Sequence, residues 1–160
     1  MAVEYSIVSN QIVSPNQPAV FQDSPCPGSD GYVYKKSGGI FLLANNAPEN
    51  TCNCGCSRCR RLYLTNYLVG VHANVQVPTG GTVDEIQFAI AVDGIPDPAS
   101  VMIYDPTAVE IPGNIGMSII SSVPSVCGCD SIALVNVGTE DVQILNGTIT
   151  FAYDGVTRIR

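Results

Sequence analysis

Cysteines are the residues of this 160-residue chain whose types and spacing most clearly suggest chemistry. Six of the seven form two clusters, which are Cys52, Cys54, Cys56 and Cys59, and then Cys127 and Cys129. Cysteines two positions apart in an extended segment point the same way, so a C-x-C pair can offer two thiolates to one metal ion. Four thiolates from the first cluster, or two from each, could hold a tetrahedral zinc ion. We therefore take all six as candidate metal ligands.

Other states of the same cysteines stay open. Zinc ribbons use two separated C-x-x-C pairs, and that spacing is not the one seen here. The thiols could instead form disulfides between loops or subunits once the protein leaves a reducing cytoplasm. Because seven is odd, one cysteine would be left for a metal, an interchain bond or no bond. We weigh metal binding and disulfide formation equally and place free thiols third.

The other reactive side chains do not assemble into a catalytic pattern. His72 is the one histidine, and strand alternation places it on the face opposite to the apolar side of the segment Val69–Val77. No nucleophile or acid lies near it in the sequence, as a catalytic histidine would need. The carboxylates are scattered over expected turns, and no glycine-rich loop precedes a helix. We therefore expect no enzyme activity, no catalytic residue and no cofactor-binding residue.

Charge and composition exclude further classes of protein. Fourteen acidic residues stand against seven basic ones, a net charge of −7, whereas a nucleic-acid binder needs a cationic surface. Only 13% of the residues are charged, about half the usual share of roughly 25%. Such a surface must be covered by small polar side chains or hidden against other subunits. We find no secretory signal and no apolar run of about 20 residues, so we expect synthesis in a cytoplasm and no membrane contact.

The elements that must position these residues are β-strands. Apolar and polar residues alternate from Val69 to Val77 and again from Ile86 to Val92, which is the period of a half-buried strand. Further strands are expected at 5–8, 19–22, 31–35, 40–44, 62–67, 101–104, 117–122, 131–137, 142–145 and 148–153. Hairpin or turn signals stand at Asp93-Gly94, Asn146-Gly147 and Asp154-Gly155. Short strands with frequent turns and no helical period predict an all-β antiparallel jelly-roll sandwich.

The length suits a single domain. We expect residues 1–22 to form an extended N-terminal segment and residues 23–160 to form the jelly-roll domain. The polar segment 45–61 holds the first cysteine cluster, and we expect it to be a long functional loop between two strands.

The order of several stretches resembles a known group of proteins. These stretches are 11–17, 20–21, 26–28, 31–40, 75–81, 86–94, 106–110, 123–130 and 142–146. The order resembles that of small jelly-roll proteins from phages and prophages of Gram-positive gut bacteria. Those proteins are similar to the trimeric globular heads of the complement and tumour-necrosis-factor-like superfamily. The cluster Cys52–Cys59 departs from that pattern, so the resemblance assigns it no role.

This resemblance implies a homotrimer in which three sandwiches pack through one sheet, and we expect Tyr63, Tyr67 and Leu68 to contribute to that packing. It also implies a virion protein, made in the host cytoplasm, that docks on phage capsid proteins as a capsid decoration or head-fibre protein. Because fold does not decide function, two alternatives stay open. One is a tail or cell-surface module that binds a host glycan or protein, and the other is a disulfide-cross-linked appendage subunit.

Overall fold

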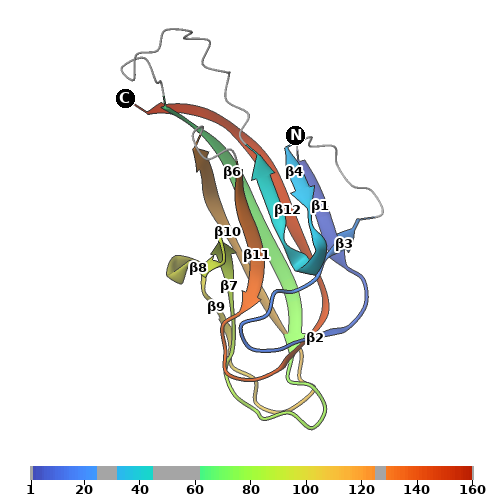
Figure 1. Ribbon diagram of the computed structural model, residues 1–160. Helices are drawn as coiled ribbons and strands as arrows, with labels where there is room; N and C mark the ends of the chain where they lie inside the picture. Colours follow the sequence, from blue (N-terminus) through green and yellow to red (C-terminus); the bar gives the residue numbers. More distant parts are fainter. Residues whose placement is uncertain (1, 25–31, 45–61, 125–128, 160) are drawn as a thin grey trace, which may run out of the picture.

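Two antiparallel sheets lie face to face in the computed structural model of the protein (Figure 1). The structure describes residues 2–24, 32–44, 62–124 and 129–159. Within these ranges the helical segments are two three-residue 3-10 turns, Ser37–Gly39 and Pro98–Ser100. The predicted all-β jelly-roll sandwich is therefore confirmed.

Each sheet contains six strands. Sheet A has the order β10 (Gly113–Pro124), β6 (Leu62–Gln76), β12 (Val142–Ile159), β1 (Ala2–Ile7) and β3 (Gln22–Asp23), with β2 (Gln11–Val13) paired to β12. Sheet B has the order β4 (Val33–Lys35), β5 (Phe41–Ala44), β11 (Cys129–Asn136), β7 (Ile86–Val92) and β8 (Ile95–Pro96), with β9 (Met102–Tyr104) paired to β7. The chain passes back and forth between the two sheets, so strands distant in sequence become neighbours.

The core lies between the sheets and is built by alternation. Along β6, Val69 and Val71 are fully buried while Leu68 and His72 are exposed, as the period-two pattern predicts. Aromatic rings join the sheets at one place: the ring of Phe41 on β5 lies 4.7 Å from that of Tyr5 and 5.0 Å from that of Phe151. Offset and tilted ring pairs at such distances stabilise a core beyond simple burial.

Two of the predicted turns are wrong. Asn146-Gly147 lies inside the continuous strand β12, at a register shift between Ile144 and Asn146. A second shift places Asp154-Gly155 in the same strand, where Gly155 has φ of 104°. The local preference for a turn is overridden here because β12 is hydrogen-bonded to other strands along both edges. Each extra residue is accommodated as a β-bulge. Asp93-Gly94, in contrast, is the expected hairpin turn between β7 and β8, with φ of 50° and 78°.

Residues 2–22, within the range expected to be an extended segment, contribute directly to both sheets. β1 lies in sheet A between β12 and β3, and Val3, Tyr5 and Ile7 are buried in the core. Farther along, the amide of Ala19 donates to the carbonyl of Leu134 on β11, at 2.8 Å. This part of the chain therefore belongs to the sandwich.

Candidate functional site

The outer face of sheet A carries four rows of cross-strand neighbours, most of them small and uncharged. The rows are Ile120, Leu68, Ala152 and Ala2; Ser118, Gly70, Thr150 and Glu4; Gly116, His72, Thr148 and Ser6; and Asn114, Asn74 and Asn146. We call these residues the neutral face. Its ionisable side chains are Glu4 and His72, although the whole chain carries a net charge of −7.

Strand alternation turns these side chains outward. On β6 the odd positions Val69 and Val71 enter the core, so the even positions Gly70 and His72 must face away from it. The registers of β10, β12 and β1 then align their own outward residues with those of β6. Because most members are Gly, Ala, Ser or Thr, little rises above the backbone over four adjacent strands.

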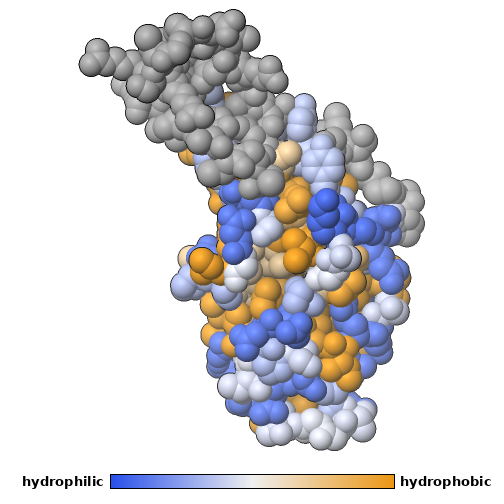
Figure 2. Space-filling model, viewed as in Figure 1, coloured by the Kyte–Doolittle hydropathy of each residue, from blue (hydrophilic) through white to orange (hydrophobic). Residues whose placement is uncertain are grey.

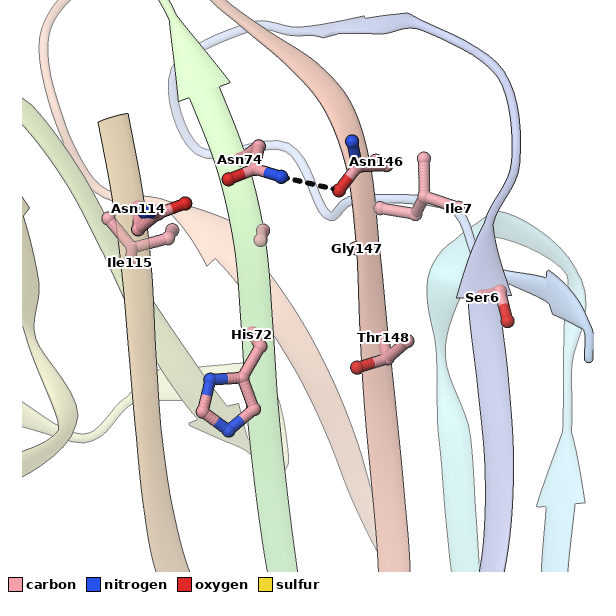
Figure 3. A pocket seen from close by; sticks show the side chains of 10 residues that line it. Ser6, Ile7, His72, Asn74, Asn114, Ile115, Asn146, Gly147 and Thr148 are labelled. Carbon is pink, nitrogen blue, oxygen red and sulfur yellow. Dashed lines mark hydrogen bonds between the residues drawn. The ribbon is translucent and has the colours of Figure 1, made fainter. Parts of the chain in front are cut away.

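His72 lies over the backbone of the neighbouring strand β10. An ideal β-carbon at Gly116 would stand only 2.5 Å from Nδ1 of the imidazole, so the glycine provides the space that the ring occupies. Figure 3 shows the ring on the β10 side of β6, away from Thr148. His72 and Thr148 line a shallow hollow of about 400 Å³.

The far rim of this hollow is a row of amides. Nδ2 of Asn74 donates a hydrogen bond of 2.7 Å to Oδ1 of Asn146, the link drawn in Figure 3, and Asn114 flanks Asn74 on β10. Imidazole, amide and hydroxyl groups give the hollow polarity without fixed charge. No nucleophile paired with a base is seen among these lining side chains.

An apolar pair lies at the other end of the neutral face. Leu68 and Ile120 are cross-strand neighbours, and they are 45% and 64% exposed. Of the three residues expected to pack between subunits, only Leu68 has this outward position. Tyr67 is fully buried, and its hydroxyl donates a hydrogen bond of 2.5 Å to the carbonyl of Ala44. By strand alternation, Tyr63 lies on the same side of β6 as Tyr67. The expectation for Tyr67 is therefore wrong, because it faces the core.

Most of the cysteines lie outside the described residues. Cys52, Cys54, Cys56, Cys59 and Cys127 are not among the residues that the structure describes, whereas Cys129 opens β11 with its backbone paired to that of Ala44. The zinc or disulfide prediction therefore stays a prediction. Within the described ranges, no group of three or more His, Cys, Asp or Glu residues is placed to hold a metal ion.

One carboxyl group outside the neutral face is electrostatically unusual. Burial raises the pKa of Asp130, at the start of β11, and the nearby Asp93 carboxylate raises it further. Asp93 itself accepts a hydrogen bond of 2.8 Å from the amide of Ser131. The carboxyl group of Asp130 is therefore harder to ionise while Asp93 carries its negative charge.

Apolar side chains also reach the surface elsewhere, as Figure 2 shows for the side in view. On the outer face of sheet B, Ala91 and Ala133 are nearly buried in a groove of about 270 Å³. Ile40 and Pro96 line the same groove. Among the residues that the structure describes, no helix is long and apolar enough to cross a membrane.

Sequence reasoning missed the neutral face as a unit. The small residues of β12 and β10 are visible in the sequence, but their alignment with Gly70 and His72 depends on cross-strand register. Alternation did predict the outward position of His72 correctly.

No family profile and no curated protein matches the chain. A solved structure matches it: the Eiger TNF from S. frugiperda, with a TM-score of 0.60 over 95% of this chain and 92% of that chain, at 11% identity. The chain has a tumour-necrosis-factor-like jelly-roll fold. At this identity the likeness concerns the fold alone, so it confirms the tumour-necrosis-factor-like part of the resemblance and leaves phage origin a prediction.

Proposed function

We propose that the protein is a non-enzymatic structural subunit that forms a homotrimer through the neutral face of sheet A. We further propose that this trimer decorates a phage capsid or forms part of a head fibre. The observation that carries the proposal is the neutral face itself.

Electrostatics favour this face for contact between identical chains. Each copy carries a charge of −7, and like charges brought together across an interface are costly. Glu4 is the only carboxylate within the neutral face. Small side chains let two backbones approach closely, and the exposed pair Leu68 and Ile120 offers apolar area to bury.

The fold supports three copies. Soluble homo-oligomers nearly always close around rotation axes. Proteins with the tumour-necrosis-factor-like fold commonly form homotrimers. A trimer would also explain the low content of charged residues, since part of each subunit surface would be covered.

The virion role is supported by the resemblance to phage jelly-roll proteins and by the gain in binding strength that repeated contacts give. Many weak contacts, repeated over a symmetric shell, add up to strong attachment through multivalency. The test is to incubate the purified protein with tail-less capsids of the phage whose genome encodes it, and separately with host cells. Co-sedimentation with capsids at a fixed ratio is expected, whereas binding to cells alone would contradict the proposal.

The groove on sheet B favours a second candidate, a module that binds a host-surface ligand. Its apolar floor at Ala91 and Ala133 is the kind of concave site in which ligands bind. In that case Ala133→Glu, which places a carboxylate in the groove, would abolish binding to cells. Under the structural proposal the same variant attaches to capsids as the unchanged protein does.

A further inference from the structure

We infer that the free edge of β10 is a binding site for an extended segment of a partner protein, which pairs with it as an additional strand of sheet A. The occupant is an uncharged segment in which apolar residues take alternate positions. This site uses the backbone at the margin of the sheet, so it adds a second kind of contact to the one proposed for the neutral face.

β10 is the last strand on one side of sheet A, as Figure 1 shows. It pairs with β6 in one continuous register from Gly113 to Pro124, without a bulge. The backbone groups of a strand point alternately to its two sides, so about half of the N–H and C=O groups of β10 point away from β6. Among the described residues, only those of β6 form backbone hydrogen bonds with β10. The outer groups are therefore available to a further strand.

The other sheet margins carry features that normally prevent such pairing. β3 and β8 have two residues each, and β2, β4 and β9 have three. β8 ends in Pro96, and Asp23 of β3 forms an ion pair of 2.6 Å with Lys35 of β4. Short strands, proline and charged side chains are means by which proteins keep an edge from adding another strand. β10 is different from these described strands, because it has twelve residues, none of them charged, and its one proline comes last.

The accessible part of this edge runs from Gly116 to Ser122. At its start β10 packs against sheet B, since a β-carbon at Gly113 would stand only 2.3 Å from the ring of Tyr104 on β9. Farther along, the even-numbered positions are exposed, and Met117 and Ile119 are half-buried against the core. The segment from Gly116 to Ser122 is as long as an ordinary strand, so it offers a complete pairing site.

The side chains along this edge define the chemistry of the occupant. Met117 and Ile119 keep part of their apolar surface exposed, so an apolar neighbour on that side would remove this area from water. On the opposite side, Ser118 and Ile120 are exposed and offer no charge to an incoming side chain.

β6, the strand that already pairs with β10, shows the same chemistry. Leu62–Gln76 contains no Asp, Glu, Lys or Arg, and apolar residues take alternate positions from Val69 to Val75. In strand addition, backbone hydrogen bonds supply the affinity and alternate side chains supply the specificity. A partner segment that resembles β6 in this pattern therefore fits the free edge.

The probe is a synthetic peptide with the sequence of residues 65–76, and the readout is amide hydrogen exchange of the full chain, followed residue by residue by nuclear magnetic resonance. In the free protein, alternate amides from Gly116 to Ser122 should exchange fast, and those bonded to β6 should exchange slowly. At about ten times its dissociation constant, the peptide should slow the fast set about tenfold.

Variants at two neighbouring positions test the pairing itself. The amides of Met117 and Ser118 point to opposite sides of β10, and the exchange rates show which of them lies on the free edge. Proline is then placed at that position, as Ser118→Pro with the control Ser118→Ala, or as Met117→Pro with the control Met117→Leu. Proline removes the outer donor without removing a bond to β6, so it should weaken peptide binding at least about fivefold while the control binds as the wild type does.

Three results would overturn the inference. If every amide from Gly116 to Ser122 exchanges slowly in the free protein, the edge is already covered, and protection that rises with protein concentration would identify a second copy of the chain as its occupant. The other two results are a peptide that leaves the fast set unprotected and a proline variant that binds as tightly as its control. None of them bears on the neutral face, which is tested by the mass of the assembly.

Discussion

Gly116 and His72 fit together across two strands: a β-carbon at Gly116 would lie 2.5 Å from Nδ1 of the imidazole. The glycine leaves room for the ring on the β10 side of β6 (Figure 3). The row on one side of the ring contains Ser118, Gly70 and Thr150, and the row on the other side is made of asparagines. The position of the ring on the neutral face thus depends on this pair.

The first prediction concerns this pair. Gly116→Ala should leave the melting temperature nearly unchanged, because the group it displaces is the end of an exposed side chain. The displaced ring should, however, weaken association. Gly70→Ala is the matched control, since its β-carbon would meet only Oγ of Ser118, at 3.4 Å. Calorimetry and sedimentation measure the two effects, and equal dissociation constants for both variants would contradict the expectation.

Two adjacent glycines should differ sharply in stability. Gly38 and Gly39 both have positive φ, of 75° and 79°, and such backbone costs a residue with a β-carbon about 1–2 kcal/mol. At Gly38 nothing lies within 4 Å of the new carbon, whereas at Gly39 it would stand 2.0 Å from the carbonyl oxygen of Ala19. Gly38→Ala should therefore lose only the backbone term, and Gly39→Ala clearly more. Urea unfolding measures both losses, and equal losses would show that the segment at Ala19 yields freely.

The buried amide of Asn136 should contribute strongly to stability. Its Nδ2 donates to the carbonyls of Val13 and Glu140, both at 2.9 Å, and its Oδ1 accepts from the amide of Gly138. Asn136→Ala should lower the free energy of unfolding by about 2–3 kcal/mol, because these groups lose their partner in a buried place. The exposed Asn146→Ala should change it by less than about 0.5 kcal/mol. A loss at Asn136 no larger than at Asn146 would contradict this account.

Asp130 gives a pH dependence of stability with a definite sign. Its pKa in the folded protein is raised, by burial and then by Asp93, so the folded state holds the proton to higher pH than the unfolded state does. Its contribution is therefore most favourable in acid and is lost as the pH rises through the raised pKa. Asp130→Asn should melt slightly higher than the wild type at neutral pH and at the same temperature in acid. A variant that melts lower at neutral pH would reverse the sign.

The sequence predicts the fold wherever one face of a strand decides burial. The segments Val69–Val77 and Ile86–Val92 show this, because their period of two places each side chain on one face. Asn146-Gly147 shows the limit: its preference for a turn is local, while the pairing that overrides it comes from β1, β2 and β6. The outward position predicted for Tyr67 is wrong for a related reason. Its segment has apolar residues on both faces, so the pattern does not show which face points into the core.

The candidate site was predictable only in part. The outward position of His72 follows from the sequence, but the alignment of Gly116, Thr148 and Ser6 with it depends on register between strands far apart in the chain. No single stretch of sequence records that register. The prediction for the cysteine clusters stays a prediction.

The most direct test of the central claim is the solution mass of the protein by multi-angle light scattering. We expect three times the chain mass for the wild type at about pH 8, and the mass of a single chain for Leu68→Glu/Ile120→Glu, which places two carboxylates on the neutral face. Ile103→Glu, on sheet B and 57% exposed, should keep the mass of the wild type. A monomeric wild type, or a double variant that keeps the trimeric mass, would contradict the claim that the neutral face holds the subunits together.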